Sequence, residues 1–203
     1  MIKNKFMKNI HLTLMGFEVD SFRDYAKYIE SSFQKELSFF EDGAKDLPEE
    51  IVDEYWDHYI DEAIQYSKDF PRIMRNSLFV SIYSFLEDKI VELCAPNANS
   101  NGNPNFWSVK KAVDYLKKDL GLDVPKSTKE WQYITHAIRI RNCIVHCNGV
   151  ISRSSDRANL ENSIKAIDFV DQEEGRIILD SGFCLEFLEN VHSFLRQLYQ
   201  IEN

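Results

Sequence analysis

The sequence has no apolar run long enough to cross a membrane, and it is poor in glycine and proline. A membrane-spanning helix needs about 20 predominantly apolar residues, so we expect no membrane-embedded segment. Seven Gly and five Pro among 203 residues exclude a fibrous or low-complexity protein, and an aromatic content of 13% argues against disorder. The cysteines are scattered and give no disulfide framework, which favours a reducing compartment: Cys94, Cys143, Cys147 and Cys184.

The start of the chain also lacks the features of a secretory signal peptide. Met1–Lys5 is basic, but the apolar run that follows is short, is broken by His11 and Thr13, and has no small-residue cleavage site. We therefore predict a cytoplasmic protein. The net charge of −9 counts against nonspecific binding to nucleic acid, because contacts with phosphate need clustered Lys and Arg. It does not exclude a local basic patch.

Apolar residues recur at helical spacing along most of the chain, which predicts an all-α helical bundle of five to six helices. The segment that starts at Pro71 and runs to about Cys94 is apolar on nearly every side, so we expect this helix in the centre of the bundle. The length suits a single domain over residues 1–203. Three segments are expected outside the bundle helices: an N-terminal extension (1–17), a mobile loop (148–165) and a small β-hairpin before the last helix (166–179).

The fifth predicted helix carries most of the side chains that are capable of chemistry. Ser127 and Glu130 predict a capping box at its start, and Asn148 with Gly149 predicts a left-handed stop after Cys147. At 100° per residue, one stripe of this helix is polar and the others are largely apolar. The polar stripe consists of Thr135, Arg139, Asn142 and His146.

Arg141 projects from one of the apolar stripes, beside the Asn142–His146 pair. An unpaired guanidinium in a protein core is costly, so Arg141 must reach either a polar cleft or a buried partner. In the first case the three side chains converge on one site that suits phosphate chemistry. In the second case Arg141 pairs with an acid on a neighbouring helix, Asn142 is exposed, and His146 helps to cap the helix end.

The segment Arg141-Asn142-Cys143-Ile144-Val145-His146 resembles the signature of the HEPN family. Ribonucleases of this family carry an Arg followed four to six residues later by a His, very often written R-N-x-x-x-H, and this chain matches that form at all three specified positions. The arrangement of helices over roughly residues 20–200 is also similar, and Ser81–Glu87 resembles part of the family's central helix. Some toxin members carry a Tyr two residues after the His, where this chain has Asn148.

The resemblance implies a metal-independent endoribonuclease in which a ribose 2′-OH attacks the adjacent phosphate, with no metal and no cofactor. The residue types suit this chemistry, because imidazole exchanges protons near neutral pH and guanidinium offers two parallel donors to phosphate oxygens. The implied catalytic residues are Arg141, Asn142 and His146. We also predict substrate contacts from Arg139, Arg153 and Arg157, and support for the catalytic residues from Glu87.

Members of the family typically form homodimers in which two motifs face each other across a cleft. The resemblance therefore implies RNA and a second copy of this chain as partners. It also implies the role of a toxin or antiviral defence effector, held in check by an antitoxin or another regulatory protein. Two alternatives are a non-catalytic HEPN domain that binds a nucleotide or a partner protein, and a helical scaffold whose acidic second helix binds a basic partner.

Overall fold

The computed structural model describes residues 5–94 and 108–200. It confirms the predicted all-α bundle with a small antiparallel hairpin before the last helix. The α-helices are α1 (Lys5–Lys45), α2 (Glu49–Ile64), α3 (Phe70–Cys94), α4 (Val109–Lys118), α5 (Lys129–Cys147), α6 (Arg157–Ala166) and α7 (Phe183–Gln200). The hairpin strands are β1 (Val170–Glu173) and β2 (Arg176–Leu179).

Helices α2 and α3 form one continuous rod, so the prediction that a new helix starts at Pro71 is wrong. A π-helical turn, η1 (Gln65–Asp69), joins them, and the backbone N–H of Phe70 donates to the carbonyl of Gln65, five residues back. Proline has no N–H, and its ring crowds the carbonyl one turn earlier. The wider π turn accommodates Pro71 without ending the helix. Counted with this rod as one, the described helices number six, within the predicted range.

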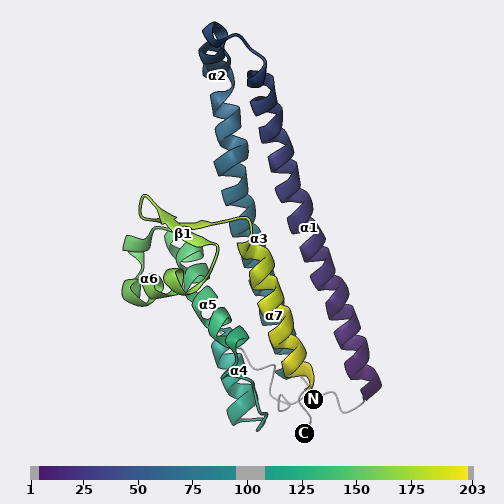
Figure 1. The fold of residues 1–203 in the computed structure, drawn as a ribbon. Helices are drawn as coiled ribbons and strands as arrows, with labels where there is room; N and C mark the ends of the chain where they lie inside the picture. Colours follow the sequence, from purple (N-terminus) through teal and green to yellow (C-terminus); the bar gives the residue numbers. More distant parts are fainter. Residues whose placement is uncertain (1–4, 95–107, 201–203) are drawn as a thin grey trace.

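The two longest rods run antiparallel and side by side, and their far ends extend as an arm beyond the rest of the molecule (Figure 1). Helix α7 packs against α1, α3 and α5, while α4, α5, α6 and the hairpin form a lobe beside α3. One cluster of buried side chains joins all these elements. At its centre the ring of Phe79 meets the rings of Phe183 and Phe187 edge-on, each at 4.8 Å between centroids. No helix within residues 5–94 and 108–200 is long and apolar enough to cross a membrane.

The predicted N-terminal extension is wrong over residues 5–17, because these residues are the first turns of α1. Met15 and Val19 are buried in the core, and Leu12 packs against it. The apolar stripe of α1 therefore begins within the residues predicted as an extension. Residues 1–4 of the predicted extension lie outside the described part of the chain.

The predicted mobile loop over 148–165 is also wrong, because it holds a 3₁₀ turn, η3 (Ile151–Arg153), and most of α6. Leu160 and Ile164, four residues apart, are both buried, so packing of a short apolar stripe holds this polar segment in a helix. The hairpin starts later than predicted, at Val170. Its strands pair from Val170 opposite Leu179 to Glu173 opposite Arg176, and the two turn residues have positive φ, as a tight hairpin requires.

Candidate functional site

The end of α5 is fixed by the two residues predicted to stop it. Asn148 has a left-handed backbone (φ 52°), Gly149 follows at φ 72°, and both backbone N–H groups donate to the carbonyl of Cys143. Asparagine tolerates this conformation far better than most residues. The position two residues after His146 thus has a backbone role here. At the other end the cap is Thr128, whose Oγ1 accepts from the N–H of Trp131, so the predicted capping box at Ser127 is wrong by one residue.

A pocket of about 310 Å³ lies along the polar stripe of α5. Its second wall comes from η3 and the start of α6, within the segment predicted as a loop. The pocket brings together four of the predicted site residues: Arg139, Asn142, His146 and Arg153. It is completed by Cys143, Cys147, Ser154, Ser155, Asp156 and Leu160.

His146 and Asn142 are both exposed to solvent. The imidazole of His146 makes no hydrogen bond or ion pair with any residue in 5–94 or 108–200. Such a ring is free to exchange a proton with a ligand in the pocket. The capping role considered for His146 is therefore not seen within the described residues.

Arg141 leaves α5 in a different direction, and it does not line this pocket. Its guanidinium lies over the ring of Tyr83 on α3, 4.5 Å from the centroid, and Nη1 donates to Oδ1 of Asn142 at 3.2 Å. Its Nε is buried without a hydrogen-bond partner among the described residues. Arg141 and His146 thus flank Asn142 instead of sharing one cavity within the chain. The prediction that Arg141, Asn142 and His146 converge on one cleft is therefore wrong for a single copy of the chain.

The alternative in which Arg141 pairs with an acid on a neighbouring helix also fails within the described residues, where the guanidinium has no ion-pair partner. Glu87 instead interacts with Tyr83. Burial, followed by the nearby Glu87 carboxylate, raises the pKa of the Tyr83 phenol, and the Arg141 charge opposes this shift. Glu87 therefore does not pair with Arg141 directly. Both side chains interact with Tyr83, which lies between them.

Ser163, His136 and Arg139 form a hydrogen-bonded group that sequence reasoning missed. Ser163 on α6 is fully buried, and its hydroxyl donates to the carbonyl of Asn159 at 2.8 Å. Its oxygen lies 3.1 Å from Nδ1 of His136 and 3.4 Å from Nη1 of Arg139. The only sequence signal was the position of His136 one turn before Arg139, because Ser163 belonged to the presumed loop.

The remaining predicted residue, Arg157, lies outside the pocket. It is exposed on the first turn of α6, where its Nε donates to Glu161 at 2.7 Å. Its predicted contact with substrate therefore depends on a ligand that extends beyond the cavity. His192 on α7 lines a separate hollow and does not join the site either.

The thiols of the pocket are weakly suited to nucleophilic or metal chemistry. Burial, with a contribution from Cys147, raises the pKa of Cys143 to about 11, which keeps it protonated at neutral pH. Among residues 5–94 and 108–200 no group of three or more His, Cys, Asp or Glu side chains is arranged to hold a metal ion. The imidazole, amide and guanidinium groups of the pocket lie together with the Asp156 carboxylate and the hydroxyls of Ser154 and Ser155.

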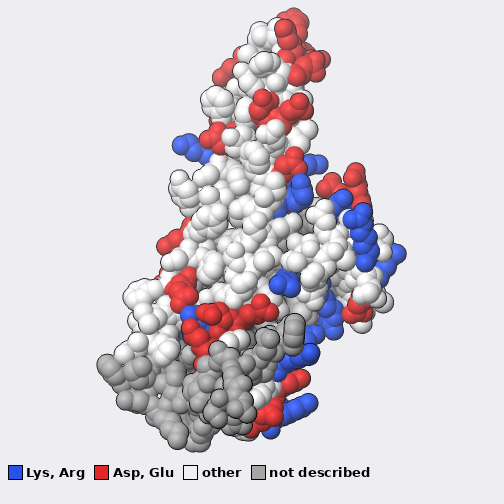
Figure 2. Space-filling model, turned by 180° about the vertical axis from the view of Figure 1, so that it is seen from behind, with Lys and Arg blue, Asp and Glu red and all other residues white. Residues whose placement is uncertain are grey.

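Charge is unevenly distributed over the surface, and the pocket lies in its basic part. Residues 108–166 contain eleven Lys and Arg against six Asp and Glu, whereas α2 contains seven acids and no Lys or Arg. Figure 2 shows the corresponding separation, with red side chains around the end of the arm and blue ones along the lobe. The net charge of −9 therefore does not describe the surface around His146.

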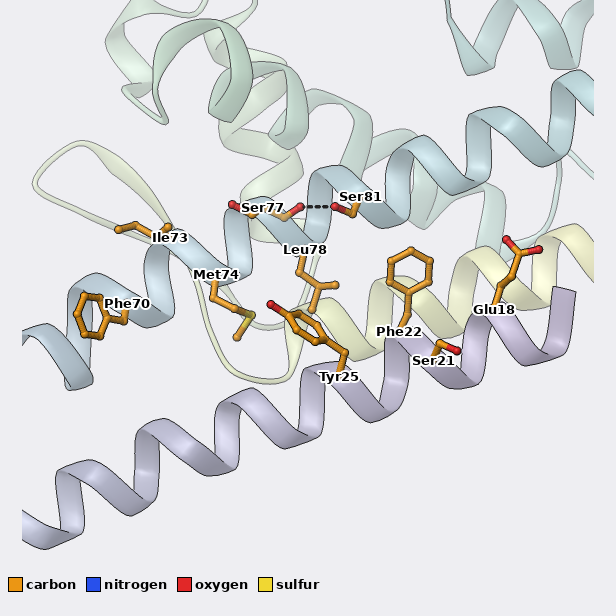
Figure 3. A pocket seen from close by; sticks show the side chains of 10 residues that line it. All are labelled: Glu18, Ser21, Phe22, Tyr25, Phe70, Ile73, Met74, Ser77, Leu78 and Ser81. Atoms are coloured by element: carbon orange, nitrogen blue, oxygen red, sulfur yellow. Dashed lines mark hydrogen bonds between the residues drawn. The ribbon is translucent and has the colours of Figure 1, made fainter.

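A larger groove of about 760 Å³ runs between α1 and α3. Figure 3 shows apolar side chains from both helices along it: Phe22, Tyr25, Phe70, Ile73, Met74 and Leu78. Its hydroxyls from Ser21 and Ser81 donate to carbonyls of their own helices. The groove presents a largely apolar surface with one charged residue, Glu18.

Comparison of the chain with protein-family models, with curated proteins and with solved structures finds no match.

Proposed function

We propose that this chain is a metal-independent endoribonuclease of the HEPN type that acts in the cytoplasm. The observation that carries the proposal is the exposed His146 in a basic pocket beside Asn142, whose amide also holds Arg141. The R-N-x-x-x-H spacing supports it, because the three side chains occupy adjacent positions around one exposed helix end. The basic lobe supports RNA as the substrate, since RNA is a chain of negative phosphates.

The proposed reaction uses the ribose itself as the nucleophile. His146 removes the proton of a 2′-OH, the 2′-oxygen forms a bond to the adjacent phosphorus, and the bond from phosphorus to the 5′-oxygen breaks. A proton returns to the departing 5′-oxygen, which leaves a 2′,3′-cyclic phosphate and a 5′-hydroxyl. Arg141 supplies donors to the phosphate oxygens, where negative charge gathers in the transition state, and Asn142 orients the guanidinium through its hydrogen bond.

A second copy of the chain completes this reaction scheme. One imidazole acts as the base while another must act as the acid, and the pocket of one copy contains only His146. In a homodimer that joins the two motifs, the partner's histidine would supply the proton, and Arg141 and His146 of different copies could act on one phosphate.

Incubation of the purified protein with labelled RNA in excess EDTA tests the activity. We expect cleavage at the same rate with and without the chelator, since no step of the scheme uses a metal ion. Cleavage that stops in EDTA and returns with added Mg²⁺ would contradict the scheme.

For the proposed role as a toxin or defence effector, expression in cells should arrest growth and degrade RNA, and unimpaired growth at high expression would contradict that role.

The α1–α3 groove favours a second function, the binding of a regulatory protein such as an antitoxin. Carboxylates exceed cations at the end of the groove near Glu18. There Glu18, Asp88 and Glu92 surround the ammonium of Lys89, whereas Lys68, Asp69 and Arg72 flank Phe70 at the other end. The occupant that fits is an amphipathic helix of the partner, apolar along its middle and carrying Lys or Arg at the end that meets Glu18.

Two synthetic helical peptides with the same apolar face test this groove, one ending in lysines and the other in glutamates. We expect the lysine peptide to bind at least about tenfold more tightly. The substitution Ile73→Glu, at a residue 55% exposed within the groove, should remove this binding. Ile60→Glu, at a residue 44% exposed on α2, is the control. Equal binding of both peptides, or equal effects of the two substitutions, would contradict the assignment.

A further inference from the structure

A group of cationic and imidazole side chains lies next to the His146 pocket, on the side toward the start of α5. Arg139 and His136 come from α5 and Lys110 from α4. The buried hydroxyl of Ser163 on α6 contacts both α5 side chains, at 3.4 Å from Nη1 of Arg139 and 3.1 Å from Nδ1 of His136. Three helices therefore hold these side chains together, in a lobe whose fold fixes their positions.

The hydrogen bonds of Ser163 determine which ring nitrogen of His136 carries the proton. A hydroxyl has one proton, and that of Ser163 goes to the carbonyl of Asn159. The oxygen of Ser163 therefore accepts from Nδ1–H of His136, which fixes the proton of this ring on Nδ1. Burial, together with the charges of Arg139 and Lys110, lowers the pKa of His136. Its Nε2 is then free to accept a hydrogen bond from a ligand, such as a ribose hydroxyl.

The positive charges of this group are poorly neutralised by the protein. Lys110 forms no ion pair with a described residue, and Arg139 has only Asp156, at 3.9 Å from its Nε. Burial and repulsion by the charge of Arg139 lower the pKa of Lys110, and the Asp156 carboxylate opposes this shift. A bound anion would relieve this repulsion, because it pairs with both charges at once.

The position of the group along α5 sets its distance from the proposed reaction. His136 and His146 are ten residues apart, so at 1.5 Å per residue they lie about 15 Å apart along the helix axis. An RNA strand that reaches both sites must therefore be several nucleotides long.

We infer that Lys110, His136 and Arg139 form a second phosphate-binding subsite, which holds the backbone of a single-stranded RNA several nucleotides from the phosphate at His146. Arg139 lines the pocket as well, so the two sites form one continuous track. This inference rests on the proposed ribonuclease function for the identity of the ligand. It adds a minimum substrate length, because a shorter RNA cannot occupy both sites.

Binding of labelled RNA oligonucleotides of increasing length to a His146→Ala protein tests the subsite without cleavage. Across lengths from about two to about eight nucleotides, we expect the affinity to rise in one step of about tenfold, at the length that first reaches both sites. Lys110→Met should remove this rise and reduce the slope of log Kd against log salt concentration by about one. The matched control is Lys111→Met, at the exposed neighbouring residue on the same helix, which should leave the rise intact.

The two hypotheses fail in different ways. If affinity rises smoothly with length, or if the Lys110 and Lys111 variants behave alike, the subsite is wrong, whatever the wild-type protein does to RNA. If the wild-type protein cleaves no RNA but the length step and its loss in Lys110→Met are observed, the chain binds single strands at this subsite without the proposed reaction. Methionine keeps most of the aliphatic stem of Lys110, so the variant should fold, and its thermal unfolding confirms this.

Discussion

The His146→Ala variant is expected to lose RNA cleavage by at least about 100-fold while keeping the fold and stability of the parent chain. The imidazole is exposed and makes no hydrogen bond or ion pair with a described residue, so its removal leaves no buried group unsatisfied. In the proposed reaction it is the group that takes the 2′-OH proton, and no other histidine lines its pocket. Cleavage of a labelled RNA under single-turnover conditions measures the loss.

The matched control is His58→Ala, which removes another exposed histidine, on α2. It should leave the cleavage rate unchanged, and both variants should unfold at the temperature of the parent. A His146→Ala protein that still cleaves RNA at close to the parental rate would remove this residue from the mechanism.

Arg141→Ala is expected to lower kcat by about 100- to 1,000-fold, the usual effect of removing a donor that stabilises transition-state charge. Arg141→Lys should restore little of this activity, because an ammonium group cannot present two parallel donors to phosphate oxygens. Since Arg141 rests on Tyr83 and, among the described residues, donates a hydrogen bond to Asn142 alone, its replacement should change the unfolding temperature slightly. Steady-state kinetics separates the two roles that the guanidinium could have.

Arg196→Ala, at an exposed arginine on α7, is the control for the loss of one positive charge. It should leave kcat unchanged. If Arg141→Ala raised KM alone, the guanidinium would bind substrate without stabilising the transition state. If both kinetic constants stayed at the parental values, Arg141 would be a packing residue on Tyr83 and the catalytic assignment would be wrong.

The parts of the fold that the sequence predicts are those specified by neighbouring residues. The end of α5 depends on Asn148 and Gly149, and the hairpin turn depends on Glu174 and Gly175, which have positive φ. Such signals act over a few residues, so they can be read without tertiary structure. Pro71 was misread because the π turn before it absorbs a residue that ordinarily ends a helix.

The fold of α6 could not be predicted, because its stability comes from contacts with distant segments. Its polar sequence resembles a loop, and only the burial of Leu160, Ser163 and Ile164 holds it as a helix. Together with η3 and residues 154–156 it supplies the second wall of the pocket, of which the sequence predicted Arg153 alone. Lys110 was missed for the same reason, since it approaches Arg139 from a helix that precedes α5 by many residues.

The site itself was predicted as a stripe and not as a cavity. Helical periodicity correctly placed Arg139, Asn142 and His146 on one face of α5. It could not show where a long side chain such as Arg141 would come to rest, because that depends on the ring of Tyr83 on α3. The separation of Arg141 from His146 within one copy makes a second copy a necessary part of the proposed mechanism.

The ends of the RNA fragments test the central claim most directly. Attack by the 2′-OH leaves a 2′,3′-cyclic phosphate on one fragment and a 5′-hydroxyl on the other, and mass spectrometry distinguishes these from the ends left by attack of water. We expect cyclic phosphate ends from the wild-type protein in EDTA and none from His146→Ala. Fragments that carry 5′-phosphate and 3′-hydroxyl ends, or RNA that remains intact with the folded wild-type protein, would contradict the account.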